Sequence, residues 1–110
     1  MTNEFHLLID DFRDYDMDHI ARTADDGRKA LLSYPVTHLY MDHDLGEYGD
    51  TAAETGYDVI TWALEHGTCP PNVQFVTANP VGRDNMAAAL ENAGYTKDGV
   101  WYRQGIIIDG

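Results

Sequence analysis

The sequence is poor in cysteine, in basic residues and in long apolar runs. Its single cysteine, Cys69, has no second thiol to pair with, so an internal disulfide is excluded and the composition suits a reducing cytoplasm. Seven lysines and arginines stand against nineteen acidic residues, and the formal net charge of -12 argues against binding to duplex DNA or to an anionic membrane. No run is long enough to cross a bilayer, and the N-terminus lacks a signal-peptide pattern. We therefore expect a cytoplasmic protein.

The apolar sequence that is present suffices for one modest core. The chain has 110 residues, of which 44% are hydrophobic, and it shows no internal repeat, low-complexity segment or linker. A chain of this length is typical of one domain. We expect a single domain over residues 1–110.

Three apolar runs end abruptly in polar residues, which is typical of buried parallel strands. They cover residues 5–9, 37–41 and 73–76, and a further short strand is expected around residues 19–22. Open α/β sheets bind their ligands at the carboxyl ends of their strands. If the three runs are neighbours, their polar ends converge on one rim of the sheet.

Helix signals separate these strands. Caps and terminators predict three helices: one opened by Thr23 and stopped by Pro35, one opened by a capping box of Thr55 and Asp58 and ended before Gly67, and one opened by Asn79 and Pro80 and ended at Gly94. The residues expected to face the core are Val59, Ile60, Ala63 and Leu64 in the second helix and Met86, Ala89, Leu90 and Ala93 in the third.

The C-terminal part has a different pattern. The dipeptide Asp98-Gly99 between two short β-type runs predicts a hairpin, and residues 106–108 have the pattern of a last strand. Alternating strands and helices imply a parallel sheet with right-handed crossovers. We expect an α/β fold of the three-layer flavodoxin or receiver-like type, shortened at the C-terminus by a hairpin and without a fifth helix.

Four acidic residues are expected at the rim of the sheet: Asp10, Asp11, Asp42 and Asp44. Carboxylates gathered in this way repel one another by roughly 1–4 kcal/mol per close pair. A divalent cation removes that repulsion, and oxygen-rich sites suit Mg²⁺. The alternative is that individual acids, Asp11 and Asp44 above all, cap helices or stay solvated.

A second half-site is expected after the third strand. Thr77 offers a hydroxyl, and Asn79 begins a helix whose N-terminus attracts anions. Arg83, one turn into the helix, can hold phosphate oxygens, and Arg13 also lies near a strand end. The plainer alternative is a helix cap beside a surface arginine.

His43, between two acids, is the candidate proton carrier. Its ordinary pKa is close to neutrality, so it can act as a general acid or base. Neighbouring strand residues point to opposite faces, so His43 can instead pack under a helix. Trp101 and Tyr102 are expected to be core residues, although they can also flank a nucleotide base.

Several motifs in this order resemble the cyclic-phosphate processing receiver-like domain, a family of bacterial and phage proteins. They are Asp10-Asp11, the run from Leu39 to Gly46, the run from Thr55 to Val59, and the run from Thr77 to Met86. The resemblance implies a receiver fold that processes cyclic phosphates on nucleotides or RNA ends. It also implies that Asp10, Asp11 and Asp42 form the acidic pocket, with His43 beside it and Asn79 and Arg83 in the loop after the third run. One departure is Val76-Thr77, where the family pattern has His-Ser.

Three functions are therefore weighed. The first is Mg²⁺-dependent hydrolysis of a cyclic phosphate on a nucleotide or RNA end, with Asp42 and His43 as the catalytic residues. The second is binding of such a ligand without turnover, which Val76 favours. The third is a phosphorelay receiver, with Asp42 as phosphoacceptor and Thr77 as the switch hydroxyl. Against it, receivers carry a lysine at the end of the fifth strand, and the lysines here are Lys29 and Lys97.

Overall fold

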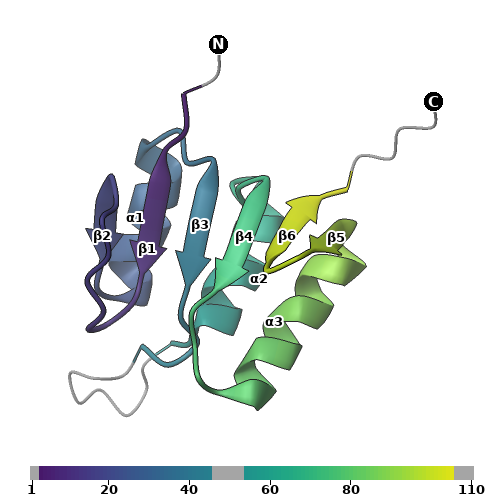
Figure 1. Ribbon diagram of the computed structural model, residues 1–110. Helices are drawn as coiled ribbons and strands as arrows, with labels where there is room; N and C mark the ends of the chain where they lie inside the picture. The colour runs from purple at the N-terminus through teal and green to yellow at the C-terminus, as the bar shows by residue number, and fades with distance from the viewer. Residues whose placement is uncertain (1–2, 46–53, 106–110) are drawn as a thin grey trace.

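The computed structural model describes residues 3–45 and 54–105. Strands and helices alternate along most of the chain (Figure 1). In order they are β1 (His6–Ile9), β2 (His19–Ala21), α1 (Ala24–Ser33), β3 (His38–Met41), α2 (Gly56–His66), β4 (Asn72–Phe75), α3 (Pro80–Asn92), β5 (Tyr95–Asp98) and β6 (Trp101–Gln104). The expected strand at residues 106–108 lies outside the described residues. Among the described helices, none has the length and apolarity needed to cross a membrane.

The six described strands form one sheet in the order β2-β1-β3-β4-β6-β5 (Figure 1). The first four in this order are parallel, and β6 runs antiparallel to both β4 and β5. Ile9 pairs with Met41, which in turn pairs with Phe75, so β1, β3 and β4 end level with one another. The polar residues that follow them leave the sheet at the same rim. The expected α/β receiver-like parallel sheet is confirmed.

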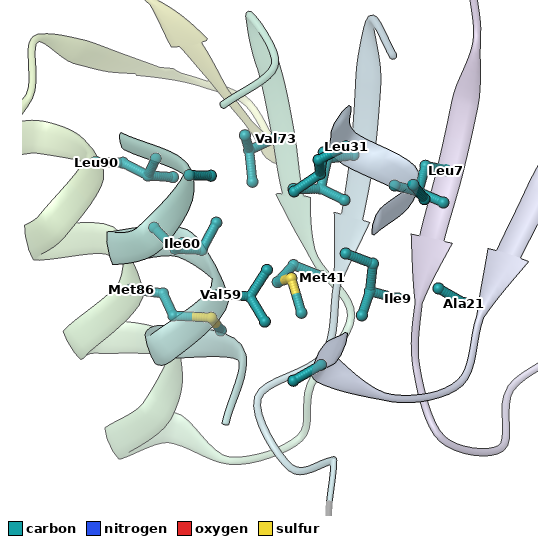
Figure 2. Close-up of a cluster of buried hydrophobic side chains, with 14 of the residues drawn as sticks. Leu7, Ile9, Ala21, Leu31, Met41, Val59, Ile60, Val73, Met86 and Leu90 are labelled. Carbon is teal, nitrogen blue, oxygen red and sulfur yellow. The ribbon is translucent and has the colours of Figure 1, made fainter. Parts of the chain in front are cut away.

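All three helices contribute to one core on one face of the sheet. Leu7, Ile9, Leu39, Met41 and Val73 belong to a single hydrophobic cluster with the buried side chains of α1, α2 and α3 (Figure 2). The described residues therefore form two layers, one of strands and one of helices. This differs from the expected three layers.

The connections between strands explain why there is one helical layer. No helix lies between β1 and β2. The helical connections β2–α1–β3, β3–α2–β4 and β4–α3–β5 all step in the same direction across the sheet. Right-handed crossovers that step in one direction place their helices on one face.

The predicted helix starts are confirmed by their caps. The hydroxyl of Thr23 accepts a hydrogen bond from the backbone of Asp26, Thr55 and Asp58 form a complete capping box, and Asn79 caps α3 with Pro80 in its first turn. Gly67 ends α2 in the left-handed region, with φ of 70°. Three predicted core positions differ: Leu64 and Ala89 are only half-buried against the core, and Ala93 is exposed because α3 ends at residue 92.

The predicted hairpin is present but its turn lies one residue later than expected. Asp98 pairs with Trp101, so Gly99 and Val100 form the turn in place of Asp98 and Gly99. Gly99 has φ of 66°, a conformation that glycine adopts without steric penalty. Because β6 runs antiparallel to β4, this turn lies at the same rim as the ends of the parallel strands.

Candidate functional site

Three carboxylates meet at the rim of the sheet. Asp10 and Asp11 follow β1, and Asp42 follows β3, its parallel neighbour. Their relative exposures are 0%, 5% and 3%, and one carboxylate oxygen from each lies within 4.8 Å of the other two. Three acidic residues buried at such short range require compensating charge. This acidic trio is the centre of the candidate site.

Asp10 is tied into the loop that follows it. One carboxylate oxygen, Oδ1, accepts hydrogen bonds from the backbone N–H groups of Phe12 and Arg13, each at 2.9 Å. The other, Oδ2, accepts from the Arg13 guanidinium at 2.8 Å. Arg22, the residue that follows β2, supports this loop by donating to the Arg13 carbonyl at 2.7 Å. The Asp10 carboxylate is thereby fixed in position.

Arg13 bridges two members of the trio. Its Nη1 atom lies 2.8 Å from Asp10 and 3.7 Å from Asp42, and its hydrogen bond to Asp10 raises the pKa of the guanidinium. Arg13 is expected from the sequence to hold phosphate. In this arrangement its guanidinium instead contacts the acids, and a phosphate at this point would share Arg13 with them.

The surroundings of Asp42 disfavour the ionised form of its carboxyl group. Burial, followed by the charge of Asp10, raises the pKa of its carboxyl group, although Arg13 and the backbone N–H of His43 act in the opposite direction. Among the described residues, Arg13 is the cation that pairs with Asp10 and Asp42. The donor set consists of hard oxygen atoms close together, which fits Mg²⁺ or a similar divalent cation.

Asp44 lies outside the acidic trio and contacts His43. Its carboxylate is 2.9 Å from Nδ1 of His43 and accepts a hydrogen bond from the side-chain amide of Asn79 at 3.3 Å. The hydrogen bond with His43 is the main cause of the lowered pKa of Asp44. We expected Asp44 to be a metal ligand; here its side chain is 64% exposed and its contacts are with His43 and Asn79.

Two glycines allow helices to approach the rim closely. A Cβ atom on Gly56 would lie 2.0 Å from the carbonyl oxygen of Asp42, and Gly56 donates its N–H to the carbonyl of His43 at 2.7 Å. A Cβ atom on Gly82 would lie 2.3 Å from the His43 ring. The sequence analysis assigned neither glycine a role, although both stand in the first turns of helices that begin at the rim.

The start of α3 confirms the capping interpretation. Oδ1 of Asn79 accepts from the N–H of Gly82 at 3.0 Å, and the hydroxyl of Thr77 accepts from the N–H of Asn79 at 3.0 Å. Thr77 is buried, with 3% exposure. The loop of residues 76–79 is therefore a fixed connection between the sheet and α3.

Arg83 contacts the hairpin side of this loop. Its guanidinium donates to the carbonyl of Thr77 at 2.6 Å, and Arg83 lines a hollow together with Lys97 and Tyr102 of the hairpin. None of its described contacts is with the acidic trio. Arg83 is expected from the sequence to hold phosphate oxygens; in the structure its side chain extends to the hairpin side of the loop.

Comparison with known proteins identifies the family. Residues 5–92 match the family described as the cyclic-phosphate processing receiver domain. The chain belongs to this family. A solved structure described as "MaeR response regulator bound to beryllium trifluoride" is similar with 22% identity and a TM-score of 0.50, covering 78% of each chain. This likeness shows a shared receiver fold. No curated protein is similar enough to count as a match.

The match to the cyclic-phosphate processing receiver domain runs from the start of the sheet to the end of α3. It therefore includes the acidic trio, His43 and the capped start of α3. The hairpin that supplies Lys97 and Tyr102 lies beyond it. The hollow beside Arg83 is therefore lined partly by residues outside the matched region.

Proposed function

We propose that this receiver-like domain is a divalent-cation-dependent enzyme that hydrolyses a cyclic phosphate on a nucleotide or an RNA end. The observation that carries the proposal is the buried trio of Asp10, Asp11 and Asp42, held at the sheet rim with one arginine between them. These three residues would hold Mg²⁺, which when bound neutralises charge on a phosphate oxygen and polarises the phosphorus–oxygen bonds.

His43 is placed to move the proton. Because Asp44 keeps an ionised carboxylate beside Nδ1, that nitrogen carries the hydrogen and Nε2 is left as a proton acceptor. Hydrolysis adds one water to phosphorus and breaks one ring P–O bond, and the released sugar oxygen takes a proton. In this proposal His43 takes the proton from the water and delivers it to the released sugar oxygen, and Asp44 and Gly82 orient its ring.

Binding without turnover is the second candidate. Two observations favour it: the His43 side chain is only 15% exposed, and Val76 stands where the family pattern has histidine. The third candidate, a phosphorelay receiver with Asp42 as phosphoacceptor, is disfavoured because Asp42 is 3% exposed and is contacted by Arg13 rather than by a lysine.

One experiment separates the three candidates. The chain is incubated with 2′,3′-cyclic nucleotides with and without Mg²⁺, and products are followed by phosphorus NMR. We expect a phosphomonoester only with Mg²⁺, and a rate lower by roughly a hundredfold or more in Asp42→Asn. Glu65→Gln removes an exposed acid at the far end of α2 and serves as the matched control. Binding without product supports the second candidate, and covalent labelling of Asp42 by a small phosphodonor supports the third.

A further inference from the structure

A hollow of about 210 Å³ lies between α3 and the β5–β6 hairpin, elements that stand beside one another in Figure 1. Its lining residues are Phe75, Arg83, Lys97, Gly99, Val100 and Tyr102. Two of these are cationic, two are aromatic, and no acidic residue of the described chain lines the hollow. The combination of positive charge and flat apolar surface suits a nucleotide.

The two cations of the hollow differ from the other five in the chain. Within residues 3–45 and 54–105, neither Arg83 nor Lys97 has a carboxylate within ion-pair distance. Each of the others has one: Arg13, Arg22, Arg28, Lys29 and Arg103. In a chain with net charge -12, the two cations that lack an acidic partner thus line the same hollow. They are available to an anion from outside.

The hollow lies at the same rim of the sheet as the acidic trio, but beside β4 and β6 rather than at the ends of β1 and β3. Arg83 donates to the carbonyl of Thr77 on one side of the 76–79 loop, whereas Asn79 contacts Asp44 on the other. The Gly99–Val100 turn brings the hairpin to the same rim as the ends of β1, β3 and β4. A ligand that fills both places must therefore carry two separate phosphate groups.

We infer that the hollow binds the nucleotide next to the reacting end, so that the preferred substrate is a short RNA with a terminal 2′,3′-cyclic phosphate rather than a mononucleotide. Arg83 and Lys97 contact the phosphodiester, and the base packs against Tyr102, Phe75 and the exposed Val100. The inference rests on the proposed function for the place of the cyclic phosphate, at the acidic trio. Binding in the hollow can be measured without turnover.

Size and charge limit the length of RNA that is recognised. The hollow is smaller than the 300 Å³ or more that is typical of whole-ligand pockets, so it accommodates part of one nucleotide. The surroundings of the hollow are acidic: burial raises the pKa of the Tyr102 phenol, and the charges of Glu91 and Asp84 of α3 add to that rise. A third nucleotide is therefore expected to add no affinity.

The test is calorimetric titration, with Mg²⁺ present, of the full chain carrying His43→Gln, so that the acidic trio keeps its cation and turnover does not interfere. The ligands are a 2′,3′-cyclic mononucleotide, a dinucleotide and a trinucleotide with the same cyclic end, and a dinucleotide that ends in hydroxyls. Lys97→Gln is compared with Lys29→Gln, which makes the same charge change on α1, where Lys29 pairs with Asp25. Lys97 is exposed and has no ion pair in the described chain, so its replacement should leave folding unchanged.

We expect the cyclic dinucleotide to bind about tenfold more tightly than the mononucleotide, with the trinucleotide no tighter. Lys97→Gln should remove most of that preference and Lys29→Gln should keep it. Equal affinities for one and two nucleotides, or equal effects of the two lysine variants, would overturn the inference. If the chain hydrolyses cyclic nucleotides but does not bind the dinucleotide more tightly, only the proposed binding in the hollow is refuted. If the chain shows no turnover and the hydroxyl-ended dinucleotide also binds more tightly than the mononucleotide, the proposed enzyme is refuted and binding of a nucleotide in the hollow is supported.

Discussion

The ring of His43 lies directly against the backbone of Gly82, so close that a Cβ atom at that glycine would stand 2.3 Å from the ring carbon Cγ. This contact joins the end of β3 to the first turn of α3. It holds the ring where Nδ1 meets Asp44 and where the amide of Asn79 is 3.4 Å away. The position of the candidate proton carrier therefore depends on a residue that has no side chain.

Replacing Gly82 with alanine should displace His43. The ring has to rotate out of contact with Asp44 and Asn79, and overpacking of this kind costs about 1–3 kcal/mol of unfolding free energy. Urea unfolding measures the loss, and turnover of a cyclic nucleotide should fall with it. Ala88→Ser, an exposed change in the same helix, is the control. Full activity in Gly82→Ala would show that the position of His43 does not matter.

Replacing Asp42 with asparagine should stabilise the cation-free protein. Burial and the charge of Asp10 disfavour the ionised form of Asp42, so removing its charge relieves repulsion of about 1 kcal/mol or more. We expect Mg²⁺ to raise the melting temperature of the unmodified chain, and the same change should abolish that rise. Scanning calorimetry with and without Mg²⁺ measures both effects, with Glu65→Gln as control. A less stable Asp42→Asn protein without Mg²⁺ would mean that the contacts of Asp42 with Arg13 and His43 outweigh the repulsion.

The stability of the fold should decrease in mild acid because of His38. Burial, and next the stacked ring of His6, lower the pKa of His38, while Glu4 acts in the opposite direction. Below the ordinary histidine value of about 6.5 the unfolded chain takes up a proton that the folded chain resists. The contribution of His38 to the unfolding free energy is therefore fully present above that value and is lost as the pH falls through its lowered pKa.

The measurement is urea unfolding between about pH 8 and about pH 5, the range in which histidines change charge. His38→Gln should flatten the slope in this range. His66→Gln, which changes an exposed histidine at the end of α2, should keep it. A slope that is the same in His38→Gln and the unmodified chain would assign the effect to other groups.

Tyr95 connects the hairpin to the loop before β4. Its hydroxyl donates to the carbonyl of Pro70 at 2.7 Å, and its ring is buried. Tyr95→Phe leaves that carbonyl without its donor and should cost about 1–2 kcal/mol of unfolding free energy. Tyr57→Phe, at an exposed position of α2, is the control.

The reactivity of the Cys69 thiol is a local measure of the effect of Tyr95→Phe. Burial raises the pKa of its thiol to about 11, so it should react slowly with thiol reagents near neutral pH. In Tyr95→Phe the rate of labelling should increase, because the hairpin separates more readily from the loop that contains Cys69. Unchanged labelling would place the stabilising contact of the hairpin elsewhere.

The sequence was sufficient to predict the strands, the caps and the acidic trio, because each depends on local pattern. Asp10, Asp11 and Asp42 follow apolar runs directly, so parallel pairing alone brings them to one rim. The number of helical layers depends on the order of the strands in space. The strand expected around residues 19–22 precedes the first expected helix, so the local pattern does show that no helix lies between β1 and β2. It does not show the order of the strands across the sheet, which makes all helical crossovers step the same way.

The direction of Arg83 could not be predicted for a similar reason. Its helical position allows contact with the rim acids or with the hairpin, and the choice depends on where β6 joins the sheet. The hairpin turn was misplaced by one residue, which hid the pairing of Lys97 with Tyr102 and so the hollow that they line with Arg83. The charged residues of the site could thus be predicted from the sequence, but the residues that they contact could not.

The aromatic contacts have a practical consequence for optical work on this protein. Both tryptophans touch an imidazole: Trp62 stacks on His66 with ring centroids 4.5 Å apart, and Trp101 meets His38 edge-on at 5.2 Å. A protonated imidazole quenches the emission of a neighbouring indole. The emission of Trp101 should therefore follow the charge state of His38, which lies at the start of β3 away from the acidic rim, and acidification should dim it before any unfolding takes place.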